Sequence, residues 1–372
     1  MIPSLYIHIP FCEKICNYCD FAKVLSSSSD TGKYIDRLLN EISSLNIKDD
    51  SLETVYIGGG TPTCLNNKGL TRLLSYLHDH FPHLKEFTIE GNPESLTHKK
   101  AALLKKYGVN RVSLGVQSAN EETLKYLGRN HNLKDVIEAV SYLRECGIDN
   151  INLDFIYGLP KETTTDLKKD IDFALSLNPT HLSFYALQIE ESTIFYNRRL
   201  IPLDDDMERD LYDYLRKVLR EHGYSRYEVS NFSKPNFESL HNKNYWHDGQ
   251  YYAAGLSASG YVVNERYTDT RSLTRYMNGF TDRKKEVIDE ETEEFEFLML
   301  NLRLEKGFEL EEFSKRFQKD FLKSYAENID KVRDSLLITD KSVAIIPDKL
   351  YIMDNILLDL LKLPDDNSHF SS

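Results

Sequence analysis

Six short runs of apolar, β-favouring residues recur along the first half of the chain, and amphipathic stretches separate them. The runs cover residues 5–9, 54–57, 87–90, 111–116, 150–156 and 181–187. We interpret each run as continuously apolar, the pattern of a strand that is buried on both faces. The stretches at 34–45, 133–146, 164–177 and 209–221 place apolar side chains on one helical face. Strand alternating with helix predicts a parallel sheet, and six such units predict an α/β fold, an incomplete (β/α)6 barrel of the TIM type.

Polar or glycine-rich residues end each of the six runs or follow it directly. They lie at 12–19, 58–63, 90–93, 117–118, 154 with 157–160, and 185–186. Parallel sheets of this kind carry their chemistry at the carboxyl ends of the strands, so these residues should gather at one edge of the barrel. The repeated placement predicts a functional site at that edge.

The chain divides into three parts by its composition. Residues 1–225 carry the predicted barrel. Residues 226–288 are rich in Tyr, Asn, Gly and Ser and hold the only tryptophan, Trp246, which predicts irregular structure and short strands that cover one barrel opening. Residues 289–372 begin with an acidic run, followed by helical patterns near 310–317 and 322–336 and β-rich runs at 343–346 and 350–353. This predicts a small winged-helix-like α+β domain, whose acidity favours a structural or lid role over DNA binding.

The charge balance argues against a nucleic-acid partner. The 372 residues carry a formal net charge of −13, which repels phosphate backbones. Two short basic strings, Arg198-Arg199 and residues 283–285, stand near acidic runs, and we expect both to be solvated surface. No apolar run approaches the ~18 residues of a transmembrane segment, and the first residues lack a signal-peptide pattern, so we expect a cytoplasmic protein.

Three of the five cysteines fall within eight residues, at Cys12, Cys16 and Cys19. In a reducing compartment such clustering predicts metal or redox chemistry rather than disulfides. Three thiolates can hold three irons of a [4Fe–4S] cluster, and the fourth iron then keeps an open site for substrate. A structural zinc site is the alternative. It needs four protein ligands, and His8 or Cys64 would have to supply the fourth.

The strings around these cysteines resemble a known family. The string Tyr-Ile-His-Ile-Pro-Phe-Cys at 6–12, the Cx3Cx2C spacing and Gly-Gly-Gly-Thr-Pro-Thr at 58–63 are similar to those of the radical SAM superfamily. Within it, the chain resembles the branch shared by oxygen-independent coproporphyrinogen III oxidase and the HemW-type haem chaperone. The resemblance covers nearly the whole chain. It implies a partial barrel of the radical SAM kind, with a [4Fe–4S] cluster and S-adenosylmethionine (SAM) as cofactors.

The resemblance also implies roles for matching positions, with SAM chelating the open iron. Gly59, Gly60 and Thr61 would lie against the methionine part of SAM, because glycine lets a backbone approach a ligand closely. Arg129 would pair with the SAM carboxylate, a geometry that suits guanidinium. The other implied contact positions are Tyr6, Tyr18, Glu90, Gln117, Asp154 and Ala186. Structural alternatives stay open: a tight turn for the glycines, helix caps or bonds to backbone amides for Glu90 and Asp154, and a surface ion pair for Arg129.

Two features separate the branches. The oxidase has a further cysteine two residues after the third cluster ligand, where this chain has Phe21. The string His-Asn-Lys-Asn-Tyr-Trp at 241–246 resembles the signature of the haem chaperones, and its imidazole, His241, is a common type of haem ligand. The alternative for His241 is a structural histidine in a hydrogen-bonded loop. Together these features favour the chaperone branch.

As a haem chaperone, the protein would bind haem as cargo and pass it to haem-accepting proteins such as membrane cytochromes. An electron donor would serve the cluster, and the protein would act in the cytoplasm or as a peripheral partner at the membrane. Two other functions stay open. One is oxidative decarboxylation of coproporphyrinogen III by a 5′-deoxyadenosyl radical. The other is a binding protein that uses its cluster only as structure or sensor.

Overall fold

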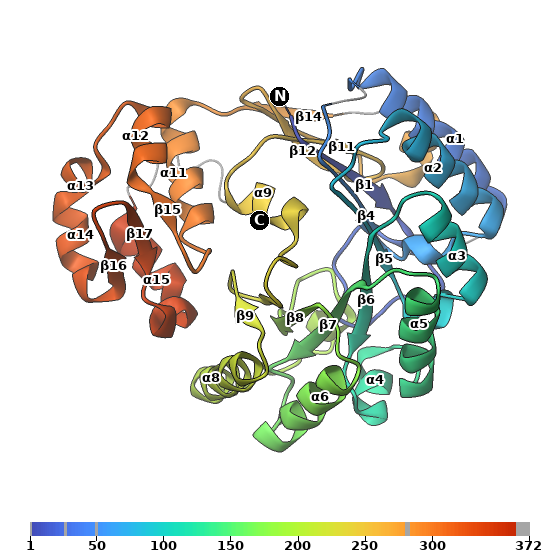
Figure 1. The fold of residues 1–372 in the computed structure, drawn as a ribbon, viewed down its shortest axis with the longest axis horizontal. Coiled ribbons are helices and arrows are strands. Elements are labelled where there is room, and N and C mark those ends of the chain that lie inside the picture. The colour runs from blue at the N-terminus through green and yellow to red at the C-terminus, as the bar shows by residue number, and fades with distance from the viewer. Residues whose placement is uncertain (1, 26–27, 49–50, 280–282, 362–372) are drawn as a thin grey trace. The chain divides into compact units, whose positions relative to one another are not determined.

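The computed structural model describes residues 2–25, 28–48, 51–279 and 283–361, and Figure 1 shows its ribbon. The chain divides into two compact units. Unit 1 comprises residues 1–225, 230–241 and 250–285, and unit 2 comprises residues 226–229, 242–249 and 286–372. The division falls close to the predicted boundary at 289, but unit 2 also takes two short pieces from the middle of the chain.

Unit 1 is built on six parallel strands that are hydrogen-bonded in the order of the sequence. The strands are β1 (Ser4–Ile9), β4 (Thr54–Gly59), β5 (Glu86–Gly91), β6 (Arg111–Gln117), β7 (Asn150–Tyr157) and β8 (His181–Ala186). Their helices are α1 (Ser28–Ser44), α2 (Asn67–His80), α3 (His98–Lys106), α5 (Leu133–Glu145), α6 (Thr164–Ser176) and α8 (Asp205–Glu221). In Figure 1 these helices line the outer side of the curved sheet. The predicted barrel of six β/α units is confirmed.

Local sequence explains where the helices begin. The side chain of Asn66 accepts a hydrogen bond from the Gly69 amide at the start of α2. Asn132 opens α5 and Thr163 opens α6, each in a reciprocal capping box with an aspartate three residues later. These caps end the preceding loops, so the residues after each strand stay at the carboxyl edge of the sheet.

The strands alternate apolar and polar side chains, and this corrects the interpretation of the runs as continuously apolar. In β1, Leu5, Ile7 and Ile9 pack in the main core of unit 1, whereas Ser4 does not. The opposite face is polar and yet at most 3% exposed at Ser4, Thr54, Thr88, Ser113, Asn152 and Ser183. Hydrogen bonds satisfy most of these groups, for example from Thr54 to Ser4 at 2.9 Å, whereas Thr88 Oγ1 is buried without a partner among the described residues. The barrel interior is therefore a hydrogen-bonded network.

Residues 226–288, expected to combine irregular structure with short strands, mostly extend the sheet. Strand β11 (Tyr251–Ala254) pairs in parallel with the free edge of β1, and β12 (Ser259–Val262) and β13 (Glu265–Thr268) follow antiparallel. At the other edge, β10 (Asn231–Ser233) pairs antiparallel with β8. The segment also holds α9 (Leu240–Trp246), α10 (Leu273–Met277), β14 (Lys284–Val287) and, across its start, β9 (Ser225–Arg226). The sequence could not show where its short strands pair, because long-range pairing, rather than local propensity, fixes their places at the edges of the sheet.

The basic string at 283–285 suggested that Arg283 is solvated surface, but the structure shows this side chain bound to two buried acids. Its Nη2 donates to Glu41 Oε1 at 2.6 Å and its Nε donates to Asp269 Oδ2 at 3.0 Å. Both carboxylates are almost completely buried, and Tyr276 donates a further hydrogen bond to Glu41. The guanidinium therefore neutralises two buried acids that would otherwise lack a counter-charge.

Unit 2 contains helices and a small antiparallel sheet. Its helices are α11 (Glu290–Asn301), α12 (Leu310–Phe317), α13 (Phe321–Ser324), α14 (Ala326–Val332) and α15 (Met353–Leu360). Its sheet has the order β15 (Phe308–Glu309), β17 (Ser342–Ile345), β16 (Leu336–Ile338). The run at 350–353, expected to be a strand, falls in the 3-10 helix Pro347–Ile352 and the start of α15. Aromatic residues Phe297, Phe308, Phe313 and Phe321 form the core. Across the described parts of both units, no helix has the length and apolarity to cross a membrane.

Candidate functional site

The three clustered cysteines lie on a loop between the short parallel strands β2 (Phe11–Cys12) and β3 (Val24–Leu25). Cys12 is buried, Cys16 and Cys19 are half-buried, and none is in a disulfide. The Thr61 hydroxyl lies 3.8 Å from the Cys12 sulfur, and Arg129 Nη1 lies 3.6 Å from the Cys16 sulfur. The loop is thus held beside Thr61, which follows β4, and beside Arg129, which follows the helix α4 (Glu121–Leu127) in the connection from β6 to β7.

The candidate fourth ligands of a zinc site are engaged elsewhere. His8 Nε2 donates to the Ala22 carbonyl at 2.8 Å, and its Nδ1 accepts from Tyr6 at 3.0 Å. The Cys64 thiol donates to the Phe11 carbonyl at 3.2 Å. Within the described ranges, no three His, Cys, Asp or Glu side chains converge as they would on a single metal ion. A cubane bonds each thiolate to a different iron, so three soft donors on one loop fit a [4Fe–4S] cluster better than zinc.

Glu90 organises the glycine string that follows β4. Its carboxylate accepts from the Tyr56 hydroxyl at 2.7 Å and from the Gly59 amide at 3.0 Å. Burial raises the pKa of Glu90 to about 7. A Cβ atom at Gly59 would lie 2.6 Å from the His8 ring, and one at Gly60 would lie 2.8 Å from the Pro10 carbonyl. The protein's own packing therefore requires glycine at both positions, whether or not a ligand also approaches the backbone there.

Arg129 is buried rather than on the surface, and it joins three parts of the site. Its Nη2 donates to Asn92 Oδ1 at 2.8 Å and to the Gly115 carbonyl at 2.6 Å, while Nη1 reaches Cys16. Its Nε is buried without a partner among the described residues. A guanidinium held in this way keeps a donor for an anionic group beside the cysteine loop.

The remaining predicted positions are distributed along the barrel. Gln117 ends β6 with a positive φ of 70°, where the β6–β7 register shifts. Asp154 accepts from Ser113 and Asn152, each at 2.7 Å, and burial raises its pKa. Tyr6 bonds His8, Tyr18 packs on a small apolar cluster, and Ala186 ends β8. The structure brings Cys16, Arg129 and Thr61 together and leaves Asp154 deeper in the interior network.

Asn92 is a residue that the sequence reasoning did not select. It accepts from Arg129, and its Nδ2 donates to Thr61 Oγ1 at 3.3 Å, so it ties the end of β5 to the residues that follow β4 and to the connection from β6 to β7. Its position two residues after Glu90, at the carboxyl end of a strand, was the signal that could have found it. Asparagine in a loop is more often read as a turn residue.

His241 lies at the opposite end of the barrel from the cysteines. Its Nδ1 is 2.7 Å from Thr54 Oγ1, and its amide donates to Glu86 Oε1 at 3.1 Å. These partners are the first residues of β4 and β5. The ring is fully buried and stacks near Tyr56, and burial lowers its pKa to about 3. Six residues on, the exposed His247 belongs to unit 2 and bonds Asn301 at 3.0 Å.

Comparison with known proteins places the chain in a family. Residues 6–174 match the radical SAM superfamily and residues 288–343 match the HemN C-terminal domain. The chain is 38% identical to heme chaperone HemW of Lactococcus lactis, over 98% of both chains. It is 37% identical to the Bacillus subtilis protein of that name, over 84% of this chain and 86% of the other, and 35% identical to the Escherichia coli protein, over 81% and 82%.

A solved structure supports the fold independently. Coproporphyrinogen III oxidase (HemN) from Escherichia coli, a radical SAM enzyme, superposes with a TM-score of 0.83 at 22% identity, over 97% of this chain and 90% of the other. The radical SAM family carries a [4Fe–4S] cluster and SAM as its cofactors, and the donor set described above fits them. On the identity and coverage of its relatives, the chain belongs to the HemW family of the radical SAM superfamily.

Proposed function

We propose that the protein is a haem chaperone that binds haem and passes it to haem-accepting proteins, such as membrane cytochromes. The observation that carries the proposal is the likeness to several heme chaperones named HemW over most of the chain. The cysteine loop and the residues around it support a radical SAM site in the same molecule.

Within this site, Cys12, Cys16 and Cys19 would hold the cluster. Bound together, the cluster and SAM supply one-electron reducing chemistry, for which an electron donor is needed. Arg129, already oriented by Asn92 and Gly115, would bind an anionic group of SAM such as its carboxylate. The other predicted contacts, from Tyr6 through Ala186, remain proposals for positioning SAM along the carboxyl edge.

The surroundings of His241 favour a structural role for this residue. A haem ligand needs an open approach for a large planar ring, and this imidazole is fully buried against Thr54 and Tyr56. Its backbone amide and that of Leu240 are bonded to Glu86, which fixes the start of α9. We therefore infer that His241 joins α9 to the strands, and that haem meets another part of the protein.

The oxidase alternative depends on the position of Phe21. This side chain is 63% exposed on the cysteine loop, where the oxidase branch has a further cysteine. Likeness of fold to HemN carries no reaction with it. We infer that the protein does not convert coproporphyrinogen III.

One experiment tests these proposals together. The protein is reconstituted anaerobically with iron and sulfide, then assayed in parallel for haem binding, coproporphyrinogen III conversion and 5′-deoxyadenosine formation. We expect stoichiometric haem binding, transfer of that haem to an apo-cytochrome and no porphyrinogen conversion. Porphyrinogen turnover of order 1 per second or more would assign the oxidase reaction instead. Absence of haem binding would refute the chaperone function.

A further inference from the structure

A surface pocket follows strand β8 in unit 1. It has a volume of about 560 Å³ and is lined by Ile189, Tyr196, Asn197, Arg199 and Leu200. This volume lies within the range of ~300–1,000 Å³ that is usual for small-molecule sites. The lining combines two aliphatic side chains and an aromatic ring with one amide and one cation, so it suits a flat ligand that has both apolar surface and negative charge.

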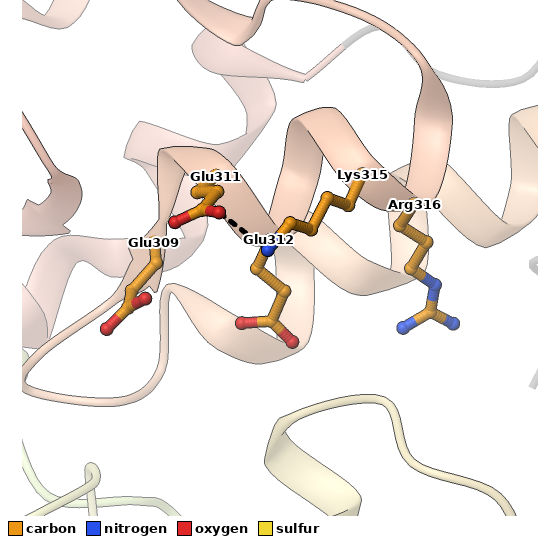
Figure 2. A pocket seen from close by; sticks show the side chains of 5 residues that line it. All are labelled: Glu309, Glu311, Glu312, Lys315 and Arg316. Atoms are coloured by element: carbon orange, nitrogen blue, oxygen red, sulfur yellow. Dashed lines mark ion pairs between the residues drawn. The ribbon is translucent and has the colours of Figure 1, made fainter.

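A second pocket shows the contrast. Figure 2 shows Glu309, Glu311, Glu312, Lys315 and Arg316 around a space of about 460 Å³ on unit 2. Glu311 and Lys315 pair with each other, and Arg316 pairs with Asp248 and Glu293. All five lining residues are charged, and these pairs already satisfy its cations. This pocket indicates no ligand class.

The pocket after β8 is built next to the cysteine loop. The Phe195 amide donates to the Asn17 carbonyl at 3.0 Å, and the Asn17 amide donates to the Leu127 carbonyl at 2.9 Å. Two of the pocket residues, Ile189 and Leu200, pack on the same small apolar cluster as Tyr18 of that loop. The pocket walls are therefore fixed to the segment that carries the cluster ligands.

The pocket also has charge that no neighbour neutralises. Arg198 and Arg199 are exposed, and neither forms an ion pair with a described residue. Arg199 lines the pocket, whereas Arg198 and the exposed Glu190 and Glu191 are close in sequence but do not line it. The chain carries a net charge of −13, so an unpaired arginine doublet is a local exception that attracts carboxylates.

One lining side chain can ligate iron. Haem iron takes imidazole, thiolate, thioether or tyrosine oxygen as protein ligands. Of the five lining residues, only Tyr196 offers such an atom, and its side chain is 46% exposed at the pocket. Its amide donates to Thr193 Oγ1 at 3.1 Å, which fixes the backbone of α7 (Ile194–Asn197) beneath it.

We propose that this pocket is the docking site of haem. The Tyr196 oxygen ligates ferric iron, Ile189 and Leu200 pack against the macrocycle, and Arg198 with Arg199 pairs with the propionates. The inference rests on the proposed haem-chaperone function and names the part of the protein where haem would bind. On ligation, a bond forms between the Tyr196 oxygen and iron, and the hydroxide previously bound to iron leaves with the phenol proton as water.

The test separates the iron ligand from the charge pairing. The reconstituted full-length protein is titrated with ferric haem and, separately, with iron-free protoporphyrin, and binding is followed by difference absorption and fluorescence. The variants are Tyr196→Phe and the double change Arg198→Gln with Arg199→Gln. Matched controls are Tyr351→Phe, at a tyrosine of similar exposure in unit 2, and Arg220→Gln, at an exposed arginine of α8. Iron content and circular dichroism confirm that each variant is folded.

We expect Tyr196→Phe to weaken haem binding about tenfold and to change the haem spectrum, while protoporphyrin binding stays within about twofold of wild type. The double arginine variant should weaken binding of both ligands about tenfold, because both carry propionates. Wild-type haem affinity and spectrum in Tyr196→Phe overturn this inference and leave the chaperone function standing. Failure of the wild-type protein to bind haem overturns both.

Discussion

Replacement of His241 by Ala tests whether this residue is structural or a haem ligand. The change removes a fully buried ring, its 2.7 Å contact with the Thr54 hydroxyl and its packing on Tyr56. Loss of a buried side chain of this size lowers the free energy of unfolding by roughly 2–4 kcal/mol, and the lost hydrogen bond accounts for about 1 kcal/mol of this decrease. We therefore expect the free energy of unfolding to fall by about 3 kcal/mol, which lowers Tm by about 6 °C.

Thr54→Val is the control because it removes the hydrogen bond to His241, together with the one to Ser4, and leaves the imidazole in place. It should lower the free energy of unfolding by about 2 kcal/mol. Thermal unfolding is followed by far-UV circular dichroism, and haem titration is done well below both transitions. We expect both variants to lose stability and to keep wild-type haem affinity. If His241→Ala loses haem and Thr54→Val keeps it at a comparable loss of stability, the structural interpretation is wrong.

The pH dependence gives a second measurement on the same residue. Burial, with a smaller effect of the Arg111 charge, lowers the pKa of His241 to about 3 in the folded protein. The unfolded chain takes up this proton near pH 6.5, so the residue's contribution to stability falls as pH decreases from 6.5 towards 3. The stability advantage of wild type over His241→Asn should shrink by about 1.4 kcal/mol for each pH unit in that window. A constant difference between pH 7.5 and 5 would contradict the buried, neutral imidazole.

Three further predictions concern the cofactor site and the packing around it. Cys16→Ala should abolish binding of the cluster, whereas Cys146→Ala should keep wild-type iron content. Iron analysis after anaerobic reconstitution distinguishes the two variants, and retained iron in Cys16→Ala would contradict the ligand assignment. Arg129→Ala should weaken SAM binding at least tenfold with the cluster intact, and an unchanged dissociation constant measured by calorimetry would show that the guanidinium does not contact SAM. Arg283→Gln should lower the free energy of unfolding by about 3 kcal/mol, because two buried carboxylates lose their counter-charge, while Lys284→Gln, a change at an exposed neighbour, should change it by less than 0.5 kcal/mol.

The order of strands and the edge that carries the site could be predicted from the sequence because both depend on local patterns. Each strand is followed by a helix, and right-handed β/α units in series leave one arrangement for the carboxyl ends. The polar interior could not be seen in the same way. Its inner positions include tyrosines and glycines, which look apolar in a linear reading, and only strand pairing shows that Thr54 meets Ser4.

The surroundings of single residues depended on contacts between distant parts of the chain. Arg283 looked like a surface cation because its neighbours in sequence are charged, but its partners Glu41 and Asp269 come from other elements. His241 belongs to a string whose resemblance suggested a ligand, and its partner Thr54 lies 187 positions away. Arg129 shows the converse, since its predicted place beside the cysteines agrees with its contact to Cys16.

The pairing of β1 with β11 has a consequence for synthesis on the ribosome. Ser4 is hydrogen-bonded in register with Tyr251, so one side of the first strand has no native partner until most of the polypeptide has emerged. At ~10 residues per second, that wait lasts roughly 25 s after the first strand leaves the exit tunnel. During this time an open backbone edge next to an apolar face can pair with other nascent chains. Translation pauses before residue 251 should therefore increase aggregation, whereas pauses after residue 270 should not.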